Sequence, residues 1–158
     1  MSDQVTNTDI AEILFQYAEL LEIDGADPFR VQAYETAALS VQNRPDPIAD
    51  AIDKGVDISR ETDIGPRLKA AIEEIVQTGE FIQLIALEES MSPDIVALSH
   101  IPGIGAKKVQ LLLDRLAPFH FDKLKDRAKS GQLKNLPGIG PKTEQAVIDY
   151  FSSIVVEN

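Results

Sequence analysis

The sequence contains no cysteine and only two histidines among its 158 residues. Disulfide frameworks and cysteine-ligated zinc sites are therefore excluded. Long apolar runs are also absent, because none approaches the roughly 18 residues that a transmembrane helix needs. The opening residues, MSDQVTNTDI, carry neither the basic segment nor the apolar core of a secretory signal peptide. We therefore expect a cytoplasmic protein without a membrane partner.

Charge is distributed unevenly along the chain. The sequence holds 15 Lys and Arg residues against 26 Asp and Glu residues, a formal net charge of −11. Residues 1–90 contain 6 basic and 19 acidic residues, a net charge of −13, whereas residues 91–158 contain 9 and 7, a net charge of +2. A strongly acidic total is unusual for a nucleic-acid-binding protein, so the two halves are interpreted separately.

Apolar residues recur at helical spacing along nearly the whole chain, and no alternating β-branched run is long enough to predict a sheet. Asp27 and Pro28 form a favoured helix start, and Asp46 with Pro47 repeats this arrangement. The pattern predicts an all-α fold, with an acidic helical domain over residues 1–90 and a second helical domain over residues 91–158. The expected helices cover about residues 7–24, 27–43, 46–54, 66–78, 80–89, 93–99, 106–116, 122–130 and 141–154.

A pentapeptide that occurs twice is the clearest motif. Residues 101–109 read IPGIGAKKV and residues 136–144 read LPGIGPKTE, with a lysine two residues after the last glycine each time. Proline lacks a backbone N–H and glycine is costly inside a helix, so this pentapeptide must form a turn. The same turn made twice predicts two copies of one helical hairpin, over residues 98–116 and 133–154.

These turns have the chemistry of a phosphate-binding site. Glycine lets an anion approach the backbone closely, and the unpaired N–H groups and dipole of the following helix attract it. Lys107 and Lys142 lie in the first helical turn, where a cation is unfavourable unless an external anion lies beside it. The alternative is a tight hairpin whose glycines only permit close helix packing, but two matched copies favour phosphate binding. The candidate DNA-binding residues are Gly103, Ile104, Gly105, Lys107, Lys108, Gly138, Ile139, Gly140, Lys142 and Thr143.

A third, altered copy is present at residues 61–65, which read ETDIG. Ile64 and Gly65 are kept, but Thr62 and Asp63 replace the proline and glycine of the other copies. Asp63 would place a carboxylate where a phosphate has to approach. This copy is therefore expected to keep an architectural role, with weak or no DNA contact.

The intact copies resemble the helix-hairpin-helix motif of DNA-binding proteins, which holds the sugar-phosphate backbone and reads no base edges. Most of the chain resembles the N-terminal region of bacterial-type family X DNA polymerases. The matching stretches are the two hairpins, DPFRVQAYETAA at 27–38 and IGPRLKAAIEEIVQTGEF at 64–81. The resemblance implies a lyase-like helical domain followed by tandem hairpins, and a role in DNA repair or recombination. It also implies a monovalent cation held by the backbone carbonyls of Ile101, Ile104, Leu136 and Ile139.

The resemblance further implies a phosphate site on the acidic half. In the family, a basic residue and a tyrosine of the second helix help to hold a 5′-phosphate at a DNA gap, and Arg30 and Tyr34 match them on one helix face. Arg67 corresponds to a further basic residue of that site. The alternative is that Tyr34 belongs to the core, on the face that carries Phe29 and Val41, while Arg30 is a solvated charge.

Two departures from the family argue against catalysis. Animal members use a Schiff-base lysine whose position is occupied here by Ala71, and Lys69 is rotated by about 200° from it around the helix. No Asp-x-Asp pair of the polymerase palm occurs for two-metal chemistry.

We therefore expect a non-catalytic protein that binds duplex, gapped or branched DNA, with no cofactor besides the hairpin cation. One alternative is a fragment or relative of a family X polymerase with gap recognition or residual lyase activity. The other is an interaction module whose acidic half binds a protein partner.

Overall fold

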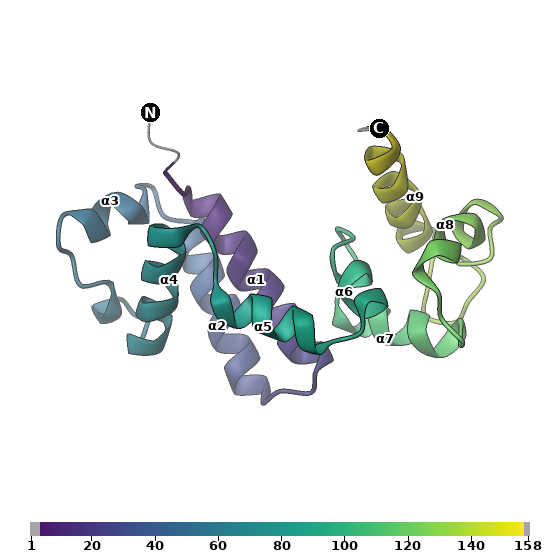
Figure 1. Ribbon diagram of the computed structural model, residues 1–158, viewed down its shortest axis with the longest axis horizontal. Coiled ribbons are helices and arrows are strands. Elements are labelled where there is room, and N and C mark those ends of the chain that lie inside the picture. The colour runs from purple at the N-terminus through teal and green to yellow at the C-terminus, as the bar shows by residue number, and fades with distance from the viewer. Residues whose placement is uncertain (1–3, 157–158) are drawn as a thin grey trace. The chain divides into compact units, whose positions relative to one another are not determined.

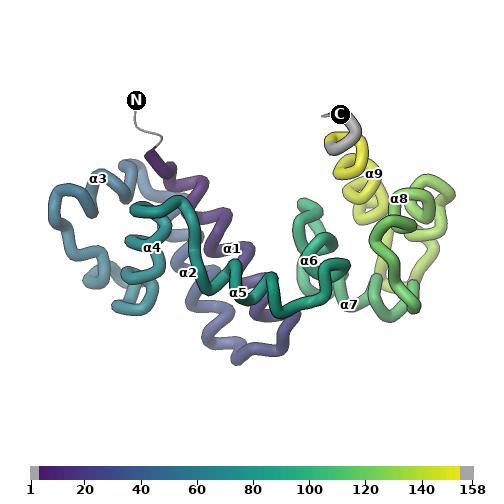
Figure 2. The backbone as a smooth tube through the Cα atoms, in the orientation of Figure 1, coloured from purple at the N-terminus to yellow at the C-terminus, as the bar shows by residue number. Residues whose placement is uncertain are grey.

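The computed structural model describes residues 4–156, and every regular element within this range is helical. The predicted all-α fold is confirmed. The helices form two compact units, one ending at Leu87 and the other beginning at Glu88, three residues before the expected boundary. Figures 1 and 2 trace the chain through the helices of each unit. None of the helices in the described range is both long and apolar enough to cross a lipid bilayer.

The first unit is built on two helices, α1 (Asn7–Ile23) and α2 (Pro28–Gln42), which pack side by side (Figure 1). α1 begins with a capping box, in which the Thr6 and Asp9 side chains each accept a hydrogen bond from the other residue's backbone N–H. α2 begins as predicted, because the Asp27 carboxylate accepts a hydrogen bond from the Phe29 N–H at 2.9 Å. Both helix starts are therefore fixed by local side chains.

The start of α3 (Ile48–Asp53) differs from the prediction that Asp46 would cap it. The helix is preceded by Pro47, and the Asp46 carboxylate instead pairs with Arg44 at 3.2 Å. The cap comes from Asn7, whose side-chain oxygen accepts a hydrogen bond from the Ile48 N–H and whose amide donates to the Asp46 carbonyl, both at 2.9 Å. A residue at the start of α1 thus holds the start of α3.

After α3 the chain forms a short 3₁₀ helix, η1 (Ile58–Arg60), then α4 (Pro66–Thr78) and α5 (Ile82–Ser90), whose last three residues belong to the second unit. α4 ends as its sequence predicts, with Gly79 in the left-handed region at a φ of +78°. α5 begins two residues later than expected, and its first N–H donates to the Glu74 carboxylate at 2.7 Å. The core is continuous through these helices, and its fully buried side chains include Ile10, Leu14, Tyr34, Val41, Ile48, Ile58, Ile64, Ile72 and Ile75.

The second unit contains α6 (Pro93–Ser99), α7 (Ala106–Arg115), α8 (Phe121–Lys129) and α9 (Pro141–Val156). The two repeated pentapeptides join α6 to α7 and lead into α9, as predicted. Aliphatic side chains from all four helices and both turns form its core. They are Leu98, Ile101, Ile104, Val109, Leu112, Leu124, Leu133, Ile139 and Val147, each no more than 4% exposed.

The contact between Asn7 and α3 predicts a measurable loss of stability. Replacing Asn7 with alanine leaves the Ile48 N–H and the Asp46 carbonyl without their partner. The free energy of unfolding should fall by about 1 kcal/mol in a urea titration. Thr8→Ala, at the exposed neighbouring position, is the control and should change it little. Equal effects of the two substitutions would contradict the assigned cap.

Candidate nucleic-acid interface

The two pentapeptide turns share one backbone geometry. In each, the isoleucine N–H donates to the carbonyl three residues earlier, at 3.2 Å in the first copy and 3.0 Å in the second. Gly103 and Gly138, which follow the prolines, have φ values of +87° and +83°. Proline at the second position and a positive φ at the third define a type II turn, which explains the Pro-Gly pair.

The helix that follows the first turn begins with uncapped N–H groups. Gly105 is extended, with φ −86° and ψ −179°, and no side chain caps α7. The first N–H groups of an α-helix have no partner within the helix, so they remain available to a ligand. A Cβ atom added at Gly105 or Gly140 would meet no atom within 4 Å, so the space beside both helix starts is open. A phosphate can approach the backbone there.

The two hairpins pack against each other reciprocally. A Cβ atom at Gly138 would lie 2.9 Å from the Leu111 Cδ1 atom of α7, and one at Gly103 would lie 3.9 Å from the Ala146 Cβ atom of α9. Pro102 also borders a hollow of about 280 Å³ whose other lining residues belong to α9. The turn of each hairpin therefore lies against the second helix of the other, and one packed body carries both helix starts.

The basic side chains of the second unit are free of internal partners. Its nine Lys and Arg side chains all lie within residues 4–153, and none of them has a carboxylate of the described residues within 4.0 Å. In the first unit, by contrast, Arg44, Arg60 and Lys69 are each paired with a carboxylate. Lys107 and Lys142 are exposed beside the helix starts. The positive charge of this surface is therefore available to an external anion.

The predicted site residues fall into two groups by exposure. Ile104, Ile139 and Thr143 are 2%, 4% and 3% exposed, so their side chains support the hairpins and only their backbone groups can face a ligand. The two turn glycines and Lys107 and Lys142 are on the surface, and Lys108 is partly buried. The sequence pattern identified both groups of residues. Their burial in the structure shows which side chains can contact a ligand and which only support the hairpins.

The backbone carbonyls named for a cation have different hydrogen-bonding states. Those of Ile101 and Leu136 each accept the turn hydrogen bond, which leaves one lone pair. Those of Ile104 and Ile139 accept no hydrogen bond within the described residues. All four oxygens therefore keep at least one free lone pair. Across residues 4–153, no group of three His, Asp or Glu side chains is placed to hold a metal ion.

The altered third copy keeps the helix start and changes the turn. Gly65 has φ −89° and ψ −177°, nearly the values of Gly105, and no side chain caps α4. The turn hydrogen bond from the Ile64 N–H to the Glu61 carbonyl is also present, at 3.1 Å. Asp63 does not adopt the positive φ of its glycine counterparts, since only glycines do so in the part of the chain described. Arg67 occupies the place of Lys107.

Tyr34 is a core residue, 1% exposed. Its ring packs edge-on against Tyr17, with centroids 4.8 Å apart, and lies 6.3 Å from the Phe81 ring. Burial and the neighbouring Tyr17 raise its pKa, while the charges of Arg30 and Arg67 act in the opposite direction. The Arg30 and Arg67 charges therefore both act on the Tyr34 hydroxyl. Phe29 does not share the core face of Tyr34, because its side chain is 82% exposed.

Arg30 is partly buried rather than fully solvated. Its Nη2 atom donates to the Tyr17 hydroxyl at 2.7 Å, and its guanidinium lies 5.8 Å from the centre of that ring. Its Nε atom is buried and has no hydrogen-bond partner in the described structure. A buried donor without a partner is costly.

The position of the Schiff-base lysine offers no free amine. Ala71 is 4% exposed and belongs to the core of the first unit. The Lys69 ammonium lies 3.2 Å from the Asp57 carboxylate. Hydrogen bonds from Ser59, aided by Lys69, lower the pKa of Asp57 to about 2. Lys69 is therefore held in an ion pair beside a carboxylate that stays ionised.

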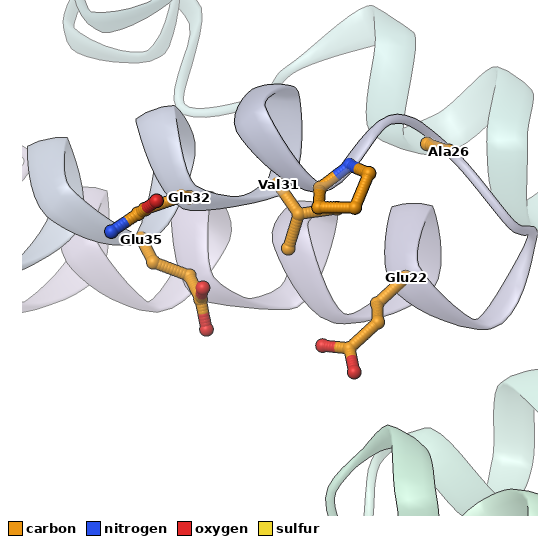
Figure 3. A pocket seen from close by; sticks show the side chains of 6 residues that line it. Glu22, Ala26, Val31, Gln32 and Glu35 are labelled. Carbon is orange, nitrogen blue, oxygen red and sulfur yellow. The ribbon is translucent and has the colours of Figure 1, made fainter.

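An acidic hollow that sequence reasoning missed lies beside α1 and α2 (Figure 3). Its volume is about 350 Å³, and Ala26, Pro28 and Val31 contribute apolar surface. Figure 3 shows the Glu22 and Glu35 carboxylates extending to the same side of the two helices. Only the acidic excess of residues 1–90 signalled such a surface in the sequence.

The sequence matches the models of two helix-hairpin-helix families. Residues 5–81 match the helix-hairpin-helix domain, and residues 62–118 and 98–153 match the SAM-like helix-hairpin-helix tandem. The tandem matches together cover more than half of the chain, which therefore belongs to the helix-hairpin-helix family.

The chain is also similar to DNA polymerase/3′-5′ exonuclease PolX of Bacillus subtilis (strain 168), with 27% identity over 140 residues. The match covers 89% of this chain and 24% of the polymerase, in its N-terminal part, so the chain spans about a quarter of that relative's length. The expected resemblance to the N-terminal region of a family X polymerase is confirmed.

The turn geometry predicts different responses at two neighbouring glycines. Gly103→Ala places a side chain at a φ of +87° and should lower the free energy of unfolding by about 1–2 kcal/mol. Gly105→Ala needs no backbone change and meets no atom within 4 Å, so it should change stability by less than about 0.5 kcal/mol. Urea titration of both variants tests this, and equal losses would contradict the assigned turn.

Proposed function

We propose that this protein binds the sugar-phosphate backbone of DNA through its two hairpins, without sequence preference and without catalysing a reaction. The observation that carries the proposal is the pair of open, glycine-bordered helix starts, beside which Lys107, Lys108 and Lys142 form no ion pair within the described residues. Membership of the helix-hairpin-helix family supports DNA as the ligand.

The binding mechanism follows from the geometry of the turns. Phosphate oxygens accept hydrogen bonds from the N–H groups at the start of α7 and α9, and the helix dipoles add to the attraction. Lys107 and Lys142 supply full charges beside these groups, and Lys108 adds a third. Such contacts are made to the backbone alone, so every DNA sequence is bound alike. A monovalent cation on the carbonyls of Ile101, Ile104, Leu136 and Ile139 would add positive charge close to the phosphate.

The acidic total of the chain does not prevent this binding. Exposed charges are screened beyond about 10 Å at 0.1 M salt, so the local charge beside a phosphate outweighs distant carboxylates. At low salt, the carboxylates of the first unit should weaken the binding of plain duplex.

In the first unit, Arg30 and Arg67 are the groups we propose for a 5′-phosphate at a DNA gap. The exposed position of Arg67 and the uncapped start of α4 beside it support this assignment. Gapped or branched DNA would then engage both units, which fits a role in DNA repair. Similarity to a family X polymerase supports the same context.

A second candidate function is docking of a basic protein partner. The acidic hollow beside α1 and α2 combines Glu22 and Glu35 with apolar surface, a lining that suits the stem and charge of a lysine or arginine side chain. Its charge is unsuited to a DNA phosphate. The two candidate functions use different units and are compatible.

Charge reversal at the hairpins tests the DNA-binding function. If about four phosphates are neutralised, the logarithm of duplex affinity should fall against the logarithm of salt concentration with a slope near −3.6. Lys107→Glu with Lys142→Glu should weaken binding to all sequences and bring the slope to about −1.8, because two contacts are lost. Fluorescence anisotropy at several salt concentrations measures both quantities.

The matched control is Lys54→Glu with Arg60→Glu, the same charge change at exposed positions of the first unit. It should leave the slope for plain duplex unchanged. Binding that does not depend on salt, or equal losses in the two double variants, would count against the hairpins.

The proposed phosphate site predicts a preference for phosphorylated gaps. The intact protein should bind a gapped duplex more tightly when the 5′ end at the gap carries a phosphate. Arg67→Ala should remove most of this preference, whereas Arg60→Ala, at a position whose side chain is 87% exposed, should keep it. Competition between the phosphorylated and unphosphorylated substrates gives the ratio directly. An unchanged ratio in Arg67→Ala would show that the site is not used.

A further inference from the structure

A second group of basic side chains lies on α8. Of its nine residues, four are basic and two acidic, and none of the four basic side chains forms an ion pair within the described structure. The repeated pentapeptide does not account for this helix, because it precedes the second turn and belongs to neither helix start. Its charge needs a separate explanation.

Lys125 and Lys129 line a hollow of about 190 Å³ together with Phe151 and Ser152 of α9. The two lysines are four residues apart and therefore lie on one face of α8. The Phe151 ring is partly exposed and is held by its neighbours, with its centroid 5.3 Å from that of Phe121 and 5.7 Å from that of Tyr150. The hollow thus combines two free cations with a fixed aromatic ring and a hydroxyl.

This combination of groups is the one that binds an unpaired nucleotide. Proteins that bind single strands place cations along the phosphates and an aromatic ring against a base. In duplex DNA the bases are stacked and paired, so a base can reach the Phe151 ring only from an unpaired segment. An acidic protein segment would also attract the lysines, but the adjacent ring and hydroxyl favour a nucleotide.

The hollow is within reach of a strand held at the second hairpin. Phe151 follows Lys142 by nine residues, so it lies about 14 Å along α9 from the helix start. Phosphates of one strand are spaced by about 3.4 Å along the axis of duplex DNA. A strand that runs along α9 from the turn therefore reaches the hollow within at most about four nucleotides, because an unpaired segment can be more extended than a duplex.

We propose that the hollow formed by Lys125, Lys129, Phe151 and Ser152 binds a nucleotide of an unpaired DNA strand that adjoins the duplex held by the hairpins. The inference rests on the proposed DNA-binding function and extends it to the preferred form of the ligand. Lys125 and Lys129 bind the phosphates, and the base stacks on Phe151. DNA with a single-stranded tail is thereby preferred to blunt duplex.

The test compares a blunt duplex with the same duplex carrying a thymidine tail, using the full chain. The intact protein should bind the tailed DNA more tightly. Phe151→Leu, and Lys125→Ser with Lys129→Ser, should each reduce the advantage of the tail by at least about fivefold, the lower end of what loss of one stacked base produces. Affinity of the Phe151→Leu variant for blunt duplex should stay within about twofold of the intact protein. Lys123→Ser, on the same helix but outside the hollow, is the control and should keep the advantage of the tail.

The Phe151→Trp variant reports directly on the contact between this ring and a base, because the native chain contains no tryptophan and the new fluorescence comes from position 151 alone. It keeps an aromatic ring, so it should retain the advantage of the tail, and its fluorescence should be quenched by tailed DNA and not by blunt duplex. If circular dichroism shows that Phe151→Leu does not fold, the Phe151→Trp variant and the double variant Lys125→Ser with Lys129→Ser still test the proposal.

The outcomes separate the two proposals. Equal binding of tailed and blunt DNA by the intact protein would overturn the nucleotide site and leave the hairpin function standing. An unchanged advantage of the tail in the double lysine variant, or no quenching of the Phe151→Trp variant by tailed DNA, would do the same. Quenching by poly-glutamate in place of the tail would assign the hollow to an acidic protein segment and also overturn it. Failure of the intact protein to bind either DNA would overturn both proposals.

Discussion

The burial of one isoleucine in each hairpin is the contact on which the DNA-binding surface depends. Ile104 and Ile139 are almost fully enclosed, and each donates its backbone N–H to the turn that precedes it. Burial fixes the position of the turn, and the turn fixes the glycine that begins the next helix. In α7 no side chain caps the helix, so its first N–H groups stay uncovered. The buried isoleucine side chains thus orient the backbone N–H groups, although these side chains do not contact the ligand themselves.

Reciprocal packing makes the two hairpins one surface. Each turn lies against the second helix of the other hairpin, through Leu111 on one side and Ala146 on the other. The separation of the two helix starts proposed to bind phosphate is therefore set by the core of the unit. Because folding already fixes the positions of both turns, little conformational entropy is lost when DNA binds. Hydrogen bonds and ion pairs to DNA therefore contribute more fully to affinity.

Local features of the fold could be predicted from the sequence, because their causes lie within a few residues. The Pro-Gly turns, the positive φ at Gly103, the Asp27 cap and the end of α4 at Gly79 are all of this kind. The core position of Tyr34 was one of two open interpretations, since a tyrosine four residues from an arginine fits either.

Features made by distant parts of the chain could not be predicted in this way. Asn7 caps a helix that starts 41 residues later, so no local sequence pattern predicts this cap. The Lys69 ion pair depends on where η1 places Asp57, and the hollow beside Phe151 depends on how α8 and α9 pack. The sequence showed which residues were charged, and the fold decided which of them were left without a partner.

The central claim is that backbone N–H groups at the two glycine-bordered helix starts bind DNA phosphates. An amide-resolved NMR titration of the ¹⁵N-labelled protein with a short duplex tests it most directly. The account predicts that the largest shifts occur at residues 105–108 and 140–143, with the same pattern for duplexes of unrelated sequence. Shifts that spare both helix starts while the duplex binds elsewhere on the protein would contradict it.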